Sequence, residues 1–340
     1  MAGGANFPGG GRPSTGGVKT WYDKIFVLER PNGEWKEAGR LPHPMGYGVS
    51  LSYGDGVVCL GGGNGSGNFS DAFVLRYTDG KVVVSSLPSM PEPLINGCGV
   101  IVGHSVYVVS ENNFWCLDLS AAGRKWQVLR PLPGVSRILA AAGVYEGKVY
   151  VFGGVHMTSD PVPLRKYLKD CWEYTPGRGW KRIADLPHAL AAAPSPAYNA
   201  GQNHLILFGG DDGALASQVA VLKDSHPGFT KDVLAYNILT DSWSVMGATP
   251  SPAPVTTPLV VWDGNIVIAG GEARPAVRTN QVLVASPRQP SGKFGGLDWT
   301  VIALYFAVVI GISVFVSKHM GSTTGDFFSA GRRYPGGLPV

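Results

Sequence analysis

Charged side chains are scarce in this chain of 340 residues, because Asp, Glu, Lys and Arg together make up only 15% of it. The formal net charge is +4, and the lysines and arginines do not cluster along the sequence. Proteins that bind nucleic acid concentrate positive charge on one face. We therefore expect no nucleic-acid partner, and we interpret the basic residues as parts of a solvated surface.

Cysteine is sparse as well, and its four residues lie far apart at positions 59, 98, 116 and 171. Neither these cysteines nor the seven scattered histidines show the short spacings of a metal site. We expect thiols within strands, no bound metal and no cofactor. The cysteines leave the redox compartment open.

Helical periodicity is also missing before residue 297, and a repeat takes its place. The pattern Trp-x5-[Leu/Thr]-Pro starts at Trp35, Trp126, Trp180 and Trp243. Short apolar runs end in the glycine pairs Gly61-Gly62, Gly153-Gly154, Gly209-Gly210 and Gly270-Gly271. A period of tens of residues is typical of solenoids and propellers.

Each repeat reads as four short strands, with hairpin turns such as Glu146-Gly147 and Asp263-Gly264. Six units result if Ala2-Gly3-Gly4 ends the second strand of a first unit and if Ser110-Glu111 stands in place of the glycine pair in the third unit. The sequence thus predicts an all-β fold, a six-bladed β-propeller over residues 1–286. The first and last units each lack one strand, so either residues upstream of Met1 are missing or closure is imperfect.

Paired glycines, a following aromatic residue and a regularly spaced tryptophan resemble the Kelch repeat. The resemblance covers roughly residues 1–286.

The C-terminal part has a different composition. Residues 287–296 are rich in Pro, Gly and Ser and predict a linker. Residues 299–317 then carry no charge, and about 20 such residues span a bilayer core. We expect a transmembrane helix within residues 297–340, because a propeller offers no place for a buried core helix. Positive residues after it (Lys318, His319, Arg332, Arg333) predict the inner membrane, with the propeller facing the periplasm.

Two stretches of this part, 297–306 and 323–332, resemble the first helix and following loop of sodium:solute symporters. A transporter needs many more helices to enclose a site. The resemblance implies that the chain is the front of a longer fusion that has been cut short.

Two sets of loops are expected on one face of the propeller, and functional side chains commonly sit on such loops. They carry Asn6, Arg12, Asn64, His156, Asp211 and Glu272 after the glycine pairs, and His43, Tyr47, Asn96, Arg137 and His188 between blades. The densest charged cluster is Glu272, Arg274 and Arg278.

The segment around this cluster, residues 269–279, resembles the signature of Kelch-type N-acetylneuraminate epimerases, or sialic acid mutarotases. Residues 2–7 and 46–50 agree with the same family. In the usual epimerase the glutamate-bearing blade lies mid-chain, whereas here it is last. The chain therefore resembles a cyclically permuted branch of that family.

This resemblance implies that Glu272 accepts the proton and that Arg278 is its partner. Interconversion of the anomers of N-acetylneuraminate needs proton transfer and ring opening, which a positioned carboxylate can assist. An arginine can hold the carboxylate of the sugar in two hydrogen bonds. Substrate contacts are also expected from Arg137, Asn6, Arg274 and Tyr47.

Other interpretations remain open at this point. Glu272 could merely cap a turn or pair with Arg278 in a non-catalytic Kelch module that binds a glycan or a protein. A sialidase is disfavoured because its Ser-x-Asp-x-Gly-x-x-Trp boxes are missing. Residues 61–67 look like a nucleotide loop, but no amphipathic helix follows them. The oligomeric state is left open.

Overall fold

The computed structural model describes residues 1–10, 16–159, 164–287 and 294–319. The chain divides into two compact units, Met1–Pro287 and Arg288–Val340, each of which is described by itself. Arg12, the linker residues 288–293 and the symporter-like stretch 323–332 lie outside the described residues.

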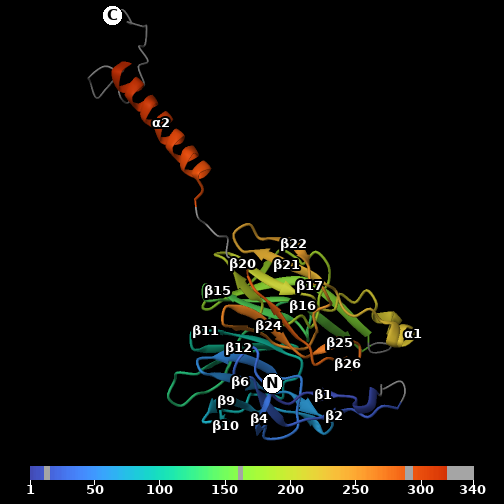
Figure 1. Ribbon diagram of the computed structural model, residues 1–340. Helices are drawn as coiled ribbons and strands as arrows, with labels where there is room; N and C mark the ends of the chain where they lie inside the picture. Colours follow the sequence, from blue (N-terminus) through green and yellow to red (C-terminus); the bar gives the residue numbers. More distant parts are fainter. Residues whose placement is uncertain (11–15, 160–163, 288–293, 320–340) are drawn as a thin grey trace, which may run out of the picture. The chain divides into compact units, whose positions relative to one another are not determined.

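The first unit is an all-β propeller of antiparallel sheets, which confirms the predicted fold class (Figure 1). Four sheets have four strands each, and each is named here by its first strand. They are the β5 blade (β5 Val49–Tyr53, β6 Gly56–Leu60, β9 Ala72–Thr78, β10 Lys81–Ser86), the β11 blade (β11 Cys98–Val102, β12 Ser105–Ser110, β13 Asn113–Asp118, β14 Gln127–Val128), the β15 blade (β15 Ala141–Tyr145, β16 Lys148–Thr158, β17 Leu164–Thr175, β18 Gly179–Ile183) and the β19 blade (β19 Tyr198–Ala200, β20 His204–Phe208, β21 Asp232–Asn237, β22 Ser242–Ala248).

The β23 blade has three strands, β23 (Leu259–Trp262), β24 (Asn265–Ala269) and β27 (Val282–Ala285). The described residues therefore form five blades, and the prediction of six was wrong. The segment expected as a first blade forms only the pair β3 (Lys24–Val27) and β4 (Lys36–Arg40). Residues 1–3 lie antiparallel to β3, with one bridge between Ala2 and Ile25 and backbone hydrogen bonds from Gly3 N to Lys24 O and from Phe26 N to Met1 O.

Short elements decorate the blades. The two-stranded hairpins β1/β2 (Ala5–Asn6, Thr20–Trp21), β7/β8 (Gly63–Asn64, Gly67–Asn68) and β25/β26 (Glu272–Arg274, Val277–Arg278) each follow a glycine pair. The short helices are η1 (Pro8–Gly10), η3 (Ala216–Gln218), α1 (Val219–Leu222) and η4 (Lys223–Ser225).

The core lies between the blades, because both faces of a blade are covered by its neighbours. Strand β12 shows this directly. Val106 and Val108 pack with the β5 blade, whereas Tyr107 and Val109, on the opposite face, pack with the β15 blade. Successive side chains of a strand point to opposite faces, so a strand buried on both faces reads as a continuous apolar run.

The repeated tryptophans join the outer strands of neighbouring blades. The indole N–H groups of Trp126, Trp180 and Trp243 donate to the carbonyls of Pro88, Arg130 and Ala184, at 2.8, 3.0 and 2.9 Å. Each of these carbonyls lies just after the last strand of the preceding blade.

Trp35 has no such acceptor among the described residues. Its preceding blade is the β23 blade, which has no fourth strand, and Trp35 is 41% exposed.

Helix α2 (Gly296–His319) belongs to the second unit. Its segment Gly296–Lys318 is long and apolar enough to cross a membrane, and none of it is buried within the described structure. A candidate membrane helix is thus present where the sequence predicts one.

Candidate active site

Five residues, called the ring residues here, lie around the axis of the propeller and are linked in series by backbone hydrogen bonds. Asn96 N donates to Tyr47 O, Leu139 N to Asn96 O, Ala192 N to Leu139 O and Thr256 N to Ala192 O, at 2.7–3.0 Å. All five residues adopt φ between 54° and 63°, although none of them is glycine. Such backbone conformations are uncommon outside glycine and tend to occur at functional sites.

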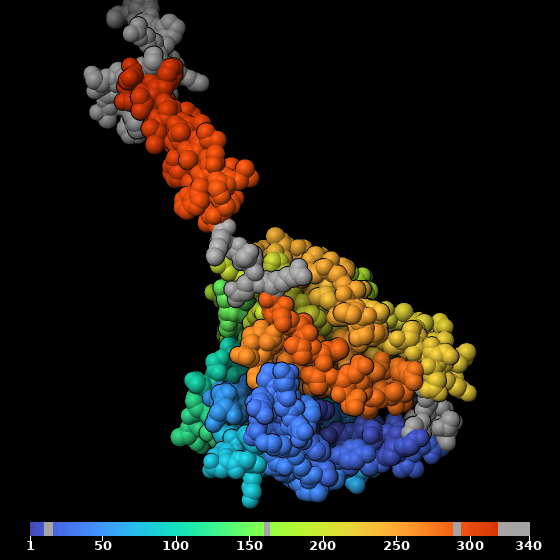
Figure 2. Space-filling model, viewed as in Figure 1, coloured from blue at the N-terminus to red at the C-terminus, as the bar shows by residue number. Residues whose placement is uncertain are grey.

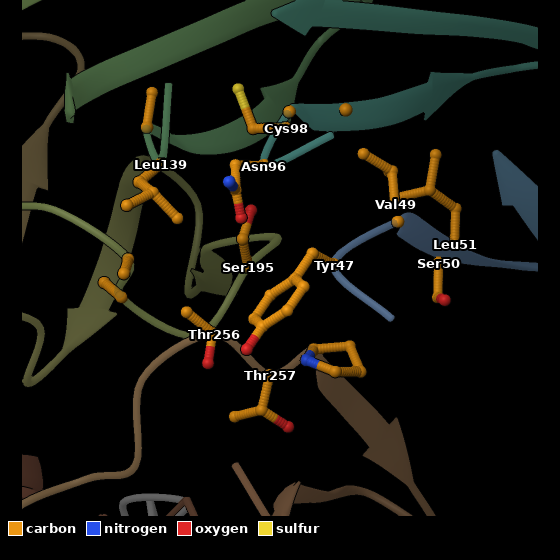
Figure 3. A pocket seen from close by; sticks show the side chains of 17 residues that line it. Tyr47, Val49, Ser50, Leu51, Asn96, Cys98, Leu139, Ser195, Thr256 and Thr257 are labelled. Atoms are coloured by element: carbon orange, nitrogen blue, oxygen red, sulfur yellow. The ribbon is translucent and has the colours of Figure 1, made fainter. Parts of the chain in front are cut away.

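These five residues line a solvent-open cavity of about 90 Å³ at the axis (Figure 3). This series of hydrogen bonds runs from Tyr47 to Thr256, and within the described residues no backbone hydrogen bond joins its two ends. The candidate site lies beside this opening.

Glu272 is fixed by the backbone that surrounds it. It follows Gly270-Gly271, whose φ angles of 67° and 104° turn the chain sharply after β24. Glu272 then exchanges two backbone hydrogen bonds of 2.9 Å with Val255, next to the ring residue Thr256. Within the β25/β26 hairpin, Glu272 lies directly opposite Arg278.

Glu272 and Arg278 form an ion pair, with 2.7 Å between Oε2 of Glu272 and Nη1 of Arg278. Both side chains are mostly buried, at 18% and 19% exposure. The other carboxylate oxygen of Glu272, Oε1, accepts a hydrogen bond of 2.7 Å from the backbone N–H of Ala276. The carboxylate is thus held at both oxygens.

Arg278 joins the two ends of the propeller. Its Nη2 donates to the hydroxyl of Tyr47 at 2.6 Å, and its Nε donates to the carbonyl of Ala5 at 3.1 Å. Figure 2 shows the N-terminal segment, in blue, against the orange segment that contains β25 and β26. The charged pair from the last blade therefore meets a tyrosine and a backbone carbonyl from the first 47 residues.

Asn6 belongs to strand β1, next to Ala5, and its Oδ1 accepts a hydrogen bond of 2.8 Å from the hydroxyl of Tyr22. The structure therefore brings Arg278 into contact with both Glu272 and Tyr47. Asn6 follows Ala5, whose carbonyl accepts a hydrogen bond from Arg278.

The remaining two predicted arginines are engaged elsewhere. Arg274 donates to the carbonyl of Asp224 at 2.6 Å and to its carboxylate at 3.3 Å, beside helix η4. Arg137 is 2% exposed and forms an ion pair of 2.6 Å with Asp170. A carboxylate of the protein thus occupies Arg137 already, and this geometry does not support its expected role as an anion contact.

Cys98 lines the axial cavity, and its ionisation is suppressed (Figure 3). Burial raises the pKa of its thiol to about 12, and the nearby charge of Arg137 offsets this only in part. Nucleophilic cysteine chemistry requires the thiolate, so Cys98 is an inert wall residue near neutral pH. The described residues contain no group of three or more His, Cys, Asp or Glu that could hold a metal ion.

Aromatic residues surround Lys19, a group that was not expected from the sequence. Its ammonium lies 4.5 Å from the centroid of the Tyr47 ring, 5.0 Å from that of Trp21 and 5.8 Å from that of Phe7. Trp21 itself packs edge-on against Tyr47, with centroids 5.6 Å apart. Lys19 directly precedes the short strand β2 (Thr20–Trp21), and the signal in the sequence was the alternation of Lys19 and Trp21.

Comparison with known proteins agrees with this architecture. The family model described as N-acetylneuraminate epimerase matches residues 87–216, a stretch that ends before Glu272. N-acetylneuraminate epimerase 1 of Escherichia coli O6:H1 is 27% identical over 231 residues, covering 59% of this chain and 59% of that protein. The N-acetylneuraminate epimerase of Haemophilus influenzae (strain 86-028NP) is 26% identical over 237 residues, covering 62% and 61%. The chain thus spans about three fifths of the length of these relatives.

A solved structure described as "Structure of YjhT" shares the fold. It is 22% identical, with a TM-score of 0.50, and the match covers 61% of this chain and 69% of that one. Together the comparisons support a Kelch propeller similar to the N-acetylneuraminate epimerases.

Proposed function

We propose that this propeller is a carbohydrate epimerase that interconverts the anomers of N-acetylneuraminate. The observation that carries the proposal is the contact of Glu272, Arg278 and Tyr47 beside the axial cavity. The similarity to N-acetylneuraminate epimerases supports it independently. We also propose that the chain has the cyclically permuted blade order, since its glutamate lies in the last blade.

Glu272 acts as the base in this proposal. Its carboxylate takes the proton of the anomeric hydroxyl as the bond between the anomeric carbon and the ring oxygen breaks, and the resulting carboxylic acid gives this proton to the ring oxygen. Rotation about the adjacent carbon–carbon bond and the reverse steps close the ring on its other face. Correctly positioned proton transfer of this kind contributes about 10²- to 10⁴-fold in rate.

Arg278 holds the carboxylate of the sugar. A guanidinium has five N–H donors, and the three neighbours of Arg278 leave donors available for a ligand. Tyr47 fixes the orientation of the guanidinium, and Asn6 lies beside Ala5, which Arg278 also contacts. Arg274 and Arg137 are paired with Asp224 and Asp170 and are not assigned a substrate contact in this proposal.

We further propose that helix α2 crosses the inner membrane, that the propeller faces the periplasm and that residues 297–340 begin a symporter-like segment. The length and apolar composition of α2 support the membrane part of this proposal.

The test compares Glu272→Gln with Arg278→Lys by proton NMR of anomer exchange. Glu272→Gln keeps the size of the side chain and removes the base, so exchange above the spontaneous rate should fall by about 10²-fold or more while binding persists. Arg278→Lys keeps one charge and loses the planar fork, so the affinity for N-acetylneuraminate should fall first. Glu34→Gln, at an exposed site, is the matched control.

A non-catalytic binding module is the second candidate, because Glu272 both accepts from the Ala276 N–H and pairs with Arg278. These two contacts are what a structural glutamate would make. If Glu272→Gln exchanges anomers at the parent rate, the epimerase proposal fails and the binding module replaces it.

A further inference from the structure

The cations of the site differ in whether a neighbouring carboxylate neutralises them. Arg278 is paired with Glu272, and Arg274 is paired with Asp224. Lys19 has no ion pair or side-chain hydrogen bond with any residue of the described ranges, although it is only partly exposed. Lys19 is therefore the uncompensated cation of this cluster.

Three aromatic rings hold the ammonium of Lys19 in place. Phe7, Trp21 and Tyr47 come from three separate segments and surround it at 4.5–5.8 Å. Aromatic faces attract a cation without neutralising it, so the ammonium keeps both its charge and its N–H donors. Trp21 also packs edge-on against Tyr47, with ring centroids 5.6 Å apart, so two of the three rings contact each other.

Tyr47 connects this cage to the charged pair. Its ring makes a cation–π contact with the ammonium of Lys19, and its hydroxyl accepts a hydrogen bond of 2.6 Å from Arg278. The guanidinium carbon of Arg278 lies 6.0 Å from the centroid of the same ring. Lys19 and Arg278 therefore both contact Tyr47, and Tyr47 also lines the axial cavity.

We propose that Lys19, held by Phe7, Trp21 and Tyr47, binds the carboxylate of an acidic sugar and gives the site its preference for acids. The inference rests on the proposed function for the identity of the sugar. Because the charge of Arg278 is offset by Glu272, the net positive charge that attracts a carboxylate comes from Lys19. Arg278 supplies directed hydrogen bonds beside it.

The test measures binding of two ligands by isothermal titration calorimetry: N-acetylneuraminate and its methyl ester, which lacks the negative charge. Lys19→Met preserves the apolar stem within the cage and removes the ammonium. We expect it to weaken binding of the acid about tenfold, as for loss of one partly buried charge contact, and to leave binding of the ester within about twofold. Lys19→Arg should keep the preference for the acid, because arginine also stacks on aromatic rings.

Lys81→Met, at an exposed lysine of strand β10, is the matched control and should change neither affinity. If methionine disturbs folding, Lys19→Gln replaces it in the same comparison. The proposal is overturned if Lys19→Met binds the acid as tightly as the parent does, if acid and ester weaken equally, or if the parent binds no acid.

Anomer exchange, measured in parallel, separates this inference from the proposed reaction. If the parent does not accelerate anomer exchange but binds the acid in a way that depends on Lys19, the proposed reaction is wrong and the proposed anion site is supported. If the parent accelerates anomer exchange and Lys19→Met leaves the affinity for the acid unchanged, the proposed reaction is supported and the proposed anion site is wrong.

Discussion

At the scale of single residues, Arg137 shows how one blade differs from its neighbours. The carbonyl of Arg137 accepts from Glu111 N, just as the carbonyls of Leu94 and Leu190 accept from Gly62 and Gly154. Arg137 thus lies where other blades place a buried leucine. Its charge is balanced by Asp170, which also accepts from the indole of Trp172 at 2.6 Å.

Removal of the partner of a buried charge is costly, so Asp170→Asn should lower the free energy of unfolding by about 3–5 kcal/mol. Asp185→Asn removes the partner of Arg182, a surface pair between residues three apart, and should cost at most about 1 kcal/mol. Urea unfolding of both variants at pH 7 measures the difference. Equal stability of the two variants would show that Arg137 does not depend on Asp170.

The same pair predicts a pH dependence. Burial raises the pKa of Asp170, but the hydrogen bonds from Arg137 and Trp172 and the charge of Arg137 outweigh burial, so the net pKa lies below the usual 3.8. A depressed carboxyl pKa stabilises the fold above the unfolded value, and this stability is lost as the pH falls through the folded pKa. The stability gap between the parent and Asp170→Asn should therefore be constant near neutral pH and shrink below about pH 3.8. A gap that widens in acid would contradict this assignment.

At the scale of elements, the glycine pairs set the shape of each blade. In the β15 blade Gly153 and Gly154 adopt φ of 55° and 105°. A Cβ on Gly153 would lie 2.2 Å from the carbonyl oxygen of Leu190, which belongs to the connection to the next blade. The pair thus allows both a left-handed turn and close contact between neighbouring blades.

Gly153→Ala and Gly147→Ala separate these two effects. Both glycines have positive φ, but a Cβ on Gly147 would meet no atom within 4 Å. Gly147→Ala should cost about 1 kcal/mol for conformational strain alone. Gly153→Ala should cost about 3 kcal/mol or more, because the backbone of Leu190 must move. Thermal unfolding followed by circular dichroism measures both, and similar costs would contradict a role in packing between blades.

At the scale of the whole molecule, the seam between the β23 blade and the N-terminal segment is the irregular part of the propeller. The β23 blade has three strands, and the segment before the β5 blade contributes the pair β3/β4 with one bridge. Arg278 crosses this seam to Ala5 and Tyr47. The proposed active site and the irregular closure therefore share the same residues.

A chain that ends at Pro287 should keep the fold, because the first unit has its own core and the second contributes no buried residue among those described. Exposure of the apolar surface of α2 to water is unfavourable, so the full chain should remain in membranes after a carbonate wash. The shortened chain should appear in the supernatant with an unchanged melting temperature. Release of the full chain by carbonate would remove the membrane proposal.

The sequence by itself determined the all-β class, the blade repeat and the candidate helix, because strand alternation, turn glycines and apolar length are local properties. It also indicated that Glu272 and Arg278 belong together, through the family resemblance and through their short spacing, and the hairpin that places them opposite each other was seen only in the structure. Even the alternative interpretation of Glu272, as a turn cap paired with Arg278, was readable in the sequence, and both contacts are present.

Only the tertiary structure decided the number of blades, the partners of the arginines and the position of Lys19. Closure depends on whether distant strands find pairing partners, and in the part of the chain that the structure describes Trp35 lacks the acceptor that its three counterparts have. Arg137 and Arg278 look alike as loop residues, yet one is buried against Asp170 and the other meets Tyr47 from a segment 231 residues away. Such contacts follow from the packing of blades around an axis, and no local pattern encodes which distant residues that packing brings together.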